Sequence, residues 1–98
     1  MQKIKHLRKR IDQLDEQILQ SLSERAEICR SIGLVKEKNV LPIQDLPREN
    51  TVYAHIREKA ADLGLDPSHV EAIYHQIVGM CSAVQDSKKV RNETEVEN

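Results

Sequence analysis

The first forty residues carry apolar residues at alternating spacings of three and four, which is the pattern of one face of an α-helix. The positions in this seven-residue register are Ile4, Leu7, Ile11, Leu14, Ile18, Ile28, Ile32 and Val35. The pattern predicts one long helix from about Ile4 to about Lys38, with a single apolar seam along it.

Two polar residues interrupt this seam. The register places Ser21 and Arg25 where apolar residues are expected. Lys36 follows Arg25 by eleven residues, about 20° round an ideal helix, so both cations point the same way. A buried cation is costly unless something pairs with it. The pattern therefore indicates an interior that is kept for an anion.

A second helix is predicted after a loop at residues 39–46. Asp45 or Leu46 is expected to cap it, and Pro47 suits its first turn. Gly64 is placed to end it in the left-handed conformation. Its apolar stripe is Val52, Ile56, Ala60 and Leu63. Glu49 faces the same way as this stripe.

A third helix is predicted from an Asp66 N-cap and Pro67. Its inward residues are predicted to be Val70, Ile73, Tyr74, Ile77, Val78, Cys81 and Val84. Gln85 follows Cys81 by four residues and falls on the same stripe. We expect residues 1–86 to form one helical domain and the polar residues 87–98 to be a disordered tail.

The length of the first helix predicts a dimer. About 35 residues span roughly 50 Å, whereas a compact chain of this size has a radius of gyration near 13 Å. The helix is too long for its own chain to cover, so we expect two long helices to pair in a homodimer. Gly33 indicates either a close helix–helix approach or a slight bend.

Composition and charge exclude several classes of partner. The formal net charge is −1, which gives no reason to expect nucleic acid or an anionic membrane as partner. No apolar run has the length of a signal peptide or a transmembrane span.

Cys29 and Cys81 are predicted to be reduced core thiols of a cytoplasmic protein, with a disulfide as the alternative.

Metal and nucleophilic chemistry find no support in the sequence. The four histidines have no metal-type spacing with each other or with the cysteines. The serines have no evident His–acid partner for a catalytic triad. We therefore expect neither a metal nor a cofactor.

Each polar candidate also has an ordinary structural explanation. Arg25 can snorkel at the edge of a seam, and Lys36 suits the C-terminal end of a helix dipole. Glu49 suits a first turn, Arg48 a surface, and Gln85 a solvated helix end. The functional interpretation rests on their joint occurrence.

The sequence resembles the all-helical chorismate mutase family over about Ile4–Gln85. The matching segments are Leu7–Asp15, Leu22–Arg25, Gly33–Lys36, Pro42–Glu49 and Cys81–Gln85. The resemblance implies an intertwined dimer of three-helix chains, in which each active site borrows an arginine from the other subunit. By position that arginine is Arg8, which lies 17 residues before Arg25, roughly 25 Å along the helix.

The resemblance also implies substrate-binding roles. Arg25 and Arg48 are expected to hold the two carboxylates of chorismate, and Glu49 to accept a hydrogen bond from its ring hydroxyl. The Asp45 backbone is expected to lie near that hydroxyl.

The remaining implied roles concern the bond that breaks. Lys36 would contact a carboxylate and the ether oxygen, and Gln85 would donate a second hydrogen bond to that oxygen. The family often has a hydroxyl residue where Cys81 stands, and a thiol is a weaker donor. Ser82 is adjacent but is expected to point about 100° away.

Three functions are compatible with this reading. The set of residues favours a mutase that converts chorismate to prephenate. A sister enzyme on the same scaffold is the second possibility, either an isochorismate pyruvate lyase or an aminodeoxychorismate mutase. The third is a non-enzymatic helical dimer, which predicts that Arg25 and Lys36 are exposed and that no pocket lies between the helices.

Overall fold

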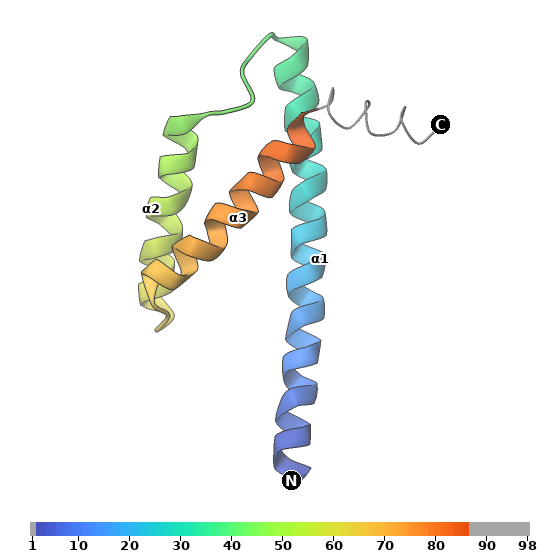
Figure 1. The fold of residues 1–98 in the computed structure, drawn as a ribbon, viewed down its shortest axis with the longest axis vertical. Coiled ribbons are helices and arrows are strands. Elements are labelled where there is room, and N and C mark those ends of the chain that lie inside the picture. The colour runs from blue at the N-terminus through green and yellow to red at the C-terminus, as the bar shows by residue number, and fades with distance from the viewer. Residues whose placement is uncertain (1, 87–98) are drawn as a thin grey trace, which may run out of the picture.

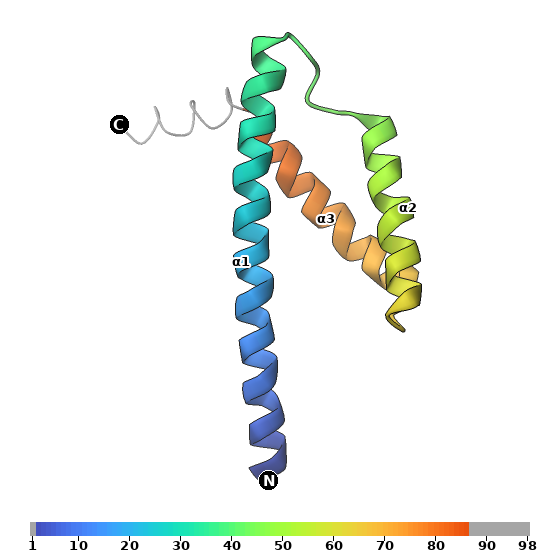
Figure 2. The same ribbon diagram turned by 180° about the vertical axis from the view of Figure 1, so that it is seen from behind.

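The chain folds into three α-helices in the order expected. The computed structural model describes residues 2–86. The helices are α1 (Gln2–Lys38), α2 (Leu46–Asp62) and α3 (Pro67–Gln85). The described residues contain no strand, so the all-α prediction is confirmed. Viewed face on, α1 and α2 stand upright, and α3 runs diagonally from the lower end of α2 to the upper part of α1 (Figures 1 and 2).

Short-range hydrogen bonds set the bounds of α2. Its first turn is capped by Asp45, whose Oδ1 accepts from the Arg48 backbone N–H at 3.1 Å. At the other end, Gly64 has a φ of 76°, and the Leu65 N–H donates to the Ala60 carbonyl at 2.8 Å. This is the left-handed C-terminal cap that the sequence predicted. Asp66 caps α3 in the same way as Asp45, accepting from the Ser68 N–H at 2.8 Å.

The end of α1 uses an unusual residue. Val40 adopts a φ of 54°, and the next residue, Leu41, donates its N–H to the Lys36 carbonyl at 2.8 Å. These bonds repeat the cap seen at Gly64, but with a β-branched residue in a conformation that favours glycine. The Val40 side chain is 90% exposed.

The helices form one thin layer, with α3 packed against both of the others. No close backbone approach joins α1 to α2 in the described chain, and the overall extents are 54 × 37 × 17 Å. Among the described residues, no large side chain is completely buried. The residues that are mostly buried are Cys29, Gly33, Ile56, Ala60, Val78 and Gln85. A layer of this thickness leaves most of its apolar side chains in contact with solvent.

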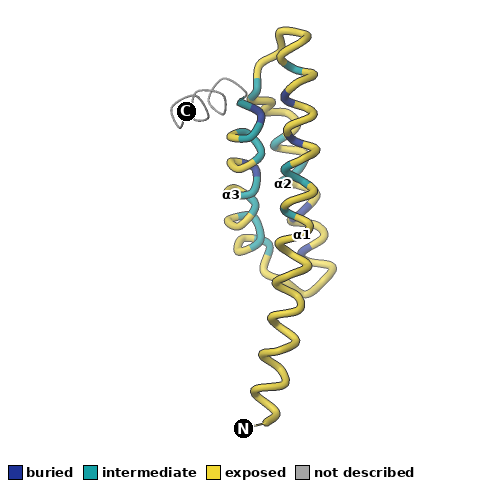
Figure 3. The backbone as a smooth tube through the Cα atoms, turned by 90° about the vertical axis from the view of Figure 1, so that its right-hand side faces the viewer, coloured by how far each residue is buried: buried dark blue, intermediate teal, exposed yellow. Residues whose placement is uncertain are grey.

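The N-terminal half of α1 extends beyond the other helices and is exposed on all sides (Figure 3). Its seam residues are between 40% and 57% exposed in the single chain: Ile4, Leu7, Ile11, Leu14 and Ile18. Leu63 and Ile73 were predicted to point inward, and this was wrong for the single chain, since they are 65% and 60% exposed. The single layer presents no second surface to cover them.

Gly33 marks a close approach of α1 to α3. A Cβ added at this position would lie 2.8 Å from both the Cα and the carbonyl oxygen of Gln85. Only glycine allows the two backbones to come this near.

In the described part of the chain, no helix is long and apolar enough to cross a membrane. The predicted tail at residues 87–98 lies outside the described residues.

Candidate active site

A cavity of about 270 Å³ lies between the C-terminal half of α1, the loop before α2, the start of α2 and the end of α3. Side chains from segments far apart in the sequence meet there. The predicted site residues that line it are Arg25, Lys36, Asp45, Arg48, Glu49, Cys81 and Gln85. The structure therefore places these residues together, while their roles toward a substrate remain predictions.

Lys36 reaches from α1 into this cavity and is half-buried. Its Nζ donates to the Ile43 carbonyl oxygen and to Gln85 Oε1, both at 2.7 Å. An ammonium group carries three N–H bonds, so the described contacts leave one for a ligand. The Ile43 contact could not be read from the sequence, because a backbone carbonyl carries no sequence signal.

Gln85 faces Lys36 from the last turn of α3. The residue is only 8% exposed, so the interpretation of a solvated helix end is wrong. While its Oε1 accepts from Lys36, its Nε2 donates to Cys81 Sγ at 3.1 Å. An amide nitrogen has two N–H bonds, and one of them remains for a ligand.

Two arginines add positive charge to the cavity wall. Arg25 is half-buried, and its Nη1 lies 3.9 Å from Cys29 Sγ, a weak contact that leaves most of its donors unused. Arg48 is exposed in the first turn of α2. The Asp45 carboxylate is engaged in capping that helix, so it stays beside the cavity as a structural group.

Glu49 places a carboxylate among these cations. Its Oε2 is buried and has no hydrogen-bond partner among the described residues. Burying an unpaired acceptor is costly, which makes this oxygen a natural position for a donor on a ligand.

Burial and the nearby carboxylates of Glu49 and Glu71 raise the pKa of Tyr53.

The two cysteines form a disulfide that contributes to the same wall. Cys29 on α1 and Cys81 on α3 are bonded, with their Cα atoms 5.5 Å apart. The prediction of reduced thiols was therefore wrong, because the packing of α1 on α3 brings the two positions within bonding range. A bonded sulfur has no S–H, so Cys81 cannot donate the weak hydrogen bond expected of it. Ser82 does line the cavity, contrary to the expectation that it points away.

Arg8 is the predicted site residue that the single chain leaves outside the cavity. It lies in the free N-terminal half of α1 and is exposed. Helix geometry accounts for this, since 17 residues along one helix separate it from Arg25 by roughly 25 Å.

The order of these residues along the chain follows a known sequence family. The profile of "Chorismate mutase type II" matches residues 7–86. The chain belongs to this family. The match includes every residue that lines the cavity and also Arg8.

Individual relatives agree with this assignment. The bifunctional chorismate mutase/prephenate dehydratase of Aquifex aeolicus is 36% identical over 93 residues, which are 92% of this chain and 26% of that protein. The chorismate mutase of Methanocaldococcus jannaschii is 28% identical over 98 residues, covering 100% of this chain and 97% of the relative. The chain thus spans about a quarter of one relative and nearly all of the other.

A solved structure has the same fold. A conserved hypothetical protein from Pyrococcus furiosus superposes with a TM-score of 0.68 at 32% sequence identity. The superposition covers 87% of this chain and 97% of that one.

Proposed function

We propose that this protein is a chorismate mutase, which rearranges chorismate to prephenate. The observation that carries the proposal is the cavity that Arg25, Lys36 and Arg48 line together with the half-buried Glu49. Chorismate is a dianion with two carboxylates, an ether oxygen and a ring hydroxyl. The three cations attract this dianion, and the unpartnered oxygen of Glu49 can accept a hydrogen bond from its hydroxyl. Guanidinium groups suit carboxylates because they bind them through two parallel hydrogen bonds.

The reaction itself needs no nucleophile, base, metal or cofactor from the protein. It is a unimolecular pericyclic shift in which a C–O bond breaks while a C–C bond forms. The protein lowers the barrier by holding the enolpyruvyl side chain over the ring. It also stabilises the negative charge that develops on the ether oxygen with fixed donors.

Lys36 and Gln85 are the donors that fit this second task. The ammonium group is held by Ile43 and Gln85 at 2.7 Å, so it is oriented before a ligand arrives. The remaining N–H of Lys36 and the remaining N–H of Gln85 Nε2 are the two donors we assign to the ether oxygen. Their mutual hydrogen bond keeps both groups in place without a solvent rearrangement during the reaction.

The site is completed by a second copy of the chain. The exposed stripe on the free half of α1 is the surface that would pair with the α1 helix of that copy. In an antiparallel or crossed pair, Arg8 of the second copy reaches the cavity that Arg8 of the same chain cannot reach. The active unit is then a homodimer with two shared sites.

A mutase that acts on the amino analogue of chorismate is the second candidate. Glu49 favours it to the same degree, because an unpaired carboxylate oxygen accepts from an ammonium group as readily as from a hydroxyl. The non-enzymatic alternative predicted exposed cations and no cavity, whereas Arg25 and Lys36 are half-buried and line one.

Product analysis tests the reaction. The purified protein is incubated separately with chorismate, isochorismate and the amino analogue, and prephenate, pyruvate with salicylate, and the rearranged amino product are measured. Lys36→Ala is expected to lower prephenate formation about 100- to 1,000-fold, since it removes one donor to the developing oxyanion. Lys38→Ala is the matched control, because Lys38 is exposed in the same last turn of α1. Equal activity of the two variants would refute the proposed mechanism.

Mixed dimers test the shared site. Arg8→Ala and Lys36→Ala chains are unfolded and refolded together. Each mixed dimer then has one cavity with both residues intact and one cavity with neither. Random pairing is expected to restore about a quarter of the wild-type activity. No recovery on mixing would show that Arg8 acts within its own chain, and full activity of Arg8→Ala chains before mixing would show that Arg8 has no role.

A further inference from the structure

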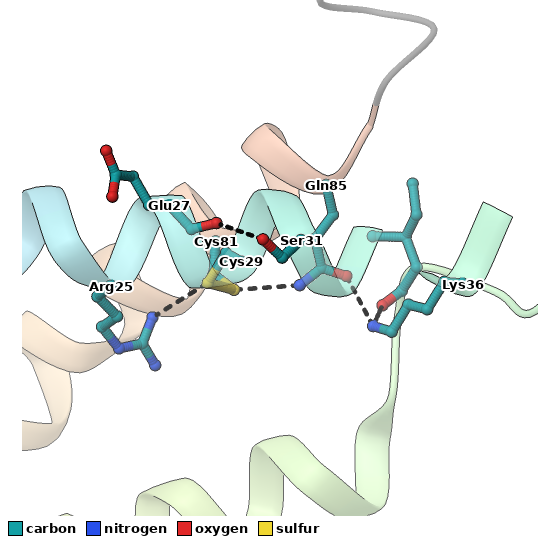
Figure 4. The surroundings of a disulfide bond; sticks show 8 residues. Arg25, Glu27, Cys29, Ser31, Lys36, Cys81 and Gln85 are labelled. Atoms are coloured by element: carbon teal, nitrogen blue, oxygen red, sulfur yellow. Dashed lines mark hydrogen bonds between the residues drawn. A yellow bond between two sulfur atoms is a disulfide. The ribbon is translucent and has the colours of Figure 1, made fainter. Parts of the chain in front are cut away.

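The disulfide is part of the cavity wall and does more than join two helices. Cys29 and Cys81 both line the cavity, and their bond links the C-terminal half of α1 to the last turns of α3. Figure 4 shows the bonded sulfurs between Arg25 on one side and Gln85 on the other, with Lys36 beyond Gln85. The bond is therefore surrounded by side chains that the proposed function uses.

The sulfur of Cys81 helps to determine how the Gln85 amide is turned. A disulfide sulfur can only accept a hydrogen bond, so it must meet the amide nitrogen, which lies 3.1 Å away. The amide oxygen meets the Lys36 ammonium at 2.7 Å, and because that ammonium can only donate, both contacts favour the same orientation of the amide. A free thiol both donates and accepts, so after reduction Lys36 would be the only one of these two contacts that favours this orientation. On the other side, Cys29 Sγ contacts Arg25 at 3.9 Å.

We propose that the Cys29–Cys81 disulfide is a positioning element for Gln85, and that its reduction lowers turnover. This inference rests on the proposed function. A small dithiol reductant supplies two electrons and two protons. The S–S bond breaks, two S–H bonds form, and the reductant closes its own disulfide. The separated sulfurs must then move apart to van der Waals distance, which shifts the atom that holds the Gln85 amide.

Kinetics of the oxidised and the reduced protein provide the first test. Thiol titration in denaturant is expected to find no free thiol before reduction and two after it. Reduction is expected to lower kcat about tenfold with a smaller change in KM, the size of effect produced by losing one well-placed hydrogen bond. A disulfide that only stabilises the fold would lower the unfolding temperature and leave kcat unchanged well below that temperature. That result would overturn the proposal.

Two variants locate the effect. Cys29→Ala leaves Cys81 as a free thiol, so its kcat is expected to equal that of the reduced wild type and to ignore the reductant. In Gln85→Ala the positioned amide is absent, so reduction is expected to cause no further loss of kcat. A full tenfold loss on reduction of Gln85→Ala would show that the disulfide acts through another residue.

A spectroscopic readout separates this inference from the proposed function. The side-chain NH₂ signal of Gln85, assigned by its loss in Gln85→Ala, is expected to shift on reduction in a ¹⁵N-labelled protein. The signal of Gln76 serves as the internal control, because this residue is exposed on the same helix. Absence of prephenate from both redox forms would refute the proposed function alone. An unmoved Gln85 signal, or two free thiols before reduction, would refute the positioning role whatever the activity.

Discussion

Replacing Gly33 by alanine perturbs the candidate site from outside the cavity. The new Cβ would lie 2.8 Å from the Gln85 Cα and from its carbonyl oxygen, and 3.1 Å from its Cβ. Two of these atoms belong to the backbone, so rotation of a side chain cannot remove the clash. Because α1 and α3 are joined nearby by the disulfide, the end of α3 must tilt away from α1 to make room.

The size of the effect follows from these distances. Ordinary contact between heavy atoms begins at about 3.5 Å, so Gln85 must move by about 0.7 Å. A displacement of that size stretches the Lys36–Gln85 hydrogen bond from 2.7 Å toward the limit of about 3.5 Å. A misplacement of about 1 Å near the reacting atoms can cost about 100-fold in rate. We expect kcat/KM for chorismate to fall about 10- to 100-fold.

Stability is expected to change much less than activity. Overpacking costs about 1–3 kcal/mol, and the better helix propensity of alanine offsets about 1 kcal/mol of that. The net loss in the free energy of unfolding is therefore about 0–2 kcal/mol, which urea unfolding measures. Gly79→Ala is the matched control on α3, because nothing lies within 4 Å of its added Cβ. It is expected to be active and about 1 kcal/mol more stable. Full activity of Gly33→Ala would refute the view that this close approach sets the position of Gln85.

Three further substitutions test the dimer and the helix ends. Ile11→Asp is expected to sediment as a monomer, because it places a charge in the seam of the proposed dimer, whereas Asp12→Asn is expected to sediment as a dimer. A dimeric Ile11→Asp would exclude this stripe as the interface. Val40→Gly is expected to stabilise the fold by about 0.5–1 kcal/mol in thermal unfolding, since glycine adopts the positive φ without strain. The control Asn39→Gly is not expected to stabilise it, because this variant loses the hydrogen bond from Asn39 Nδ2 to the Val35 carbonyl. Equal gains in stability for the two variants would contradict the strain argument. Asp66→Ala is expected to cost about 1 kcal/mol through loss of the N-cap bond to Ser68, and unchanged stability would show that water satisfies that N–H equally well.

Local sequence signals determined the helices and their ends. The apolar register of the first forty residues, the helix starts at Asp45-Leu46-Pro47 and Asp66-Pro67, and Gly64 act over one or two turns, so they could be read without tertiary information. The expected helix bounds agree with α1, α2 and α3 to within about two residues. The seam also indicated which side of α1 carries Arg25 and Lys36, because helical periodicity alone fixes the face of a residue.

The tertiary structure decided how these faces meet. The packing of α3 on α1 brings Cys29 and Cys81 within bonding range, whereas their separation of 52 residues in sequence carried no sign of a bond. The same packing buries Gln85 and brings Ser82 to the cavity, while the loop between α1 and α2 folds back to give Lys36 a backbone partner at Ile43. A sequence pattern records the chemistry of each residue and its place on its own helix. Distances between residues on different helices arise only when the helices pack, and those distances made the disulfide, the lysine–glutamine pair and the unpartnered carboxylate oxygen.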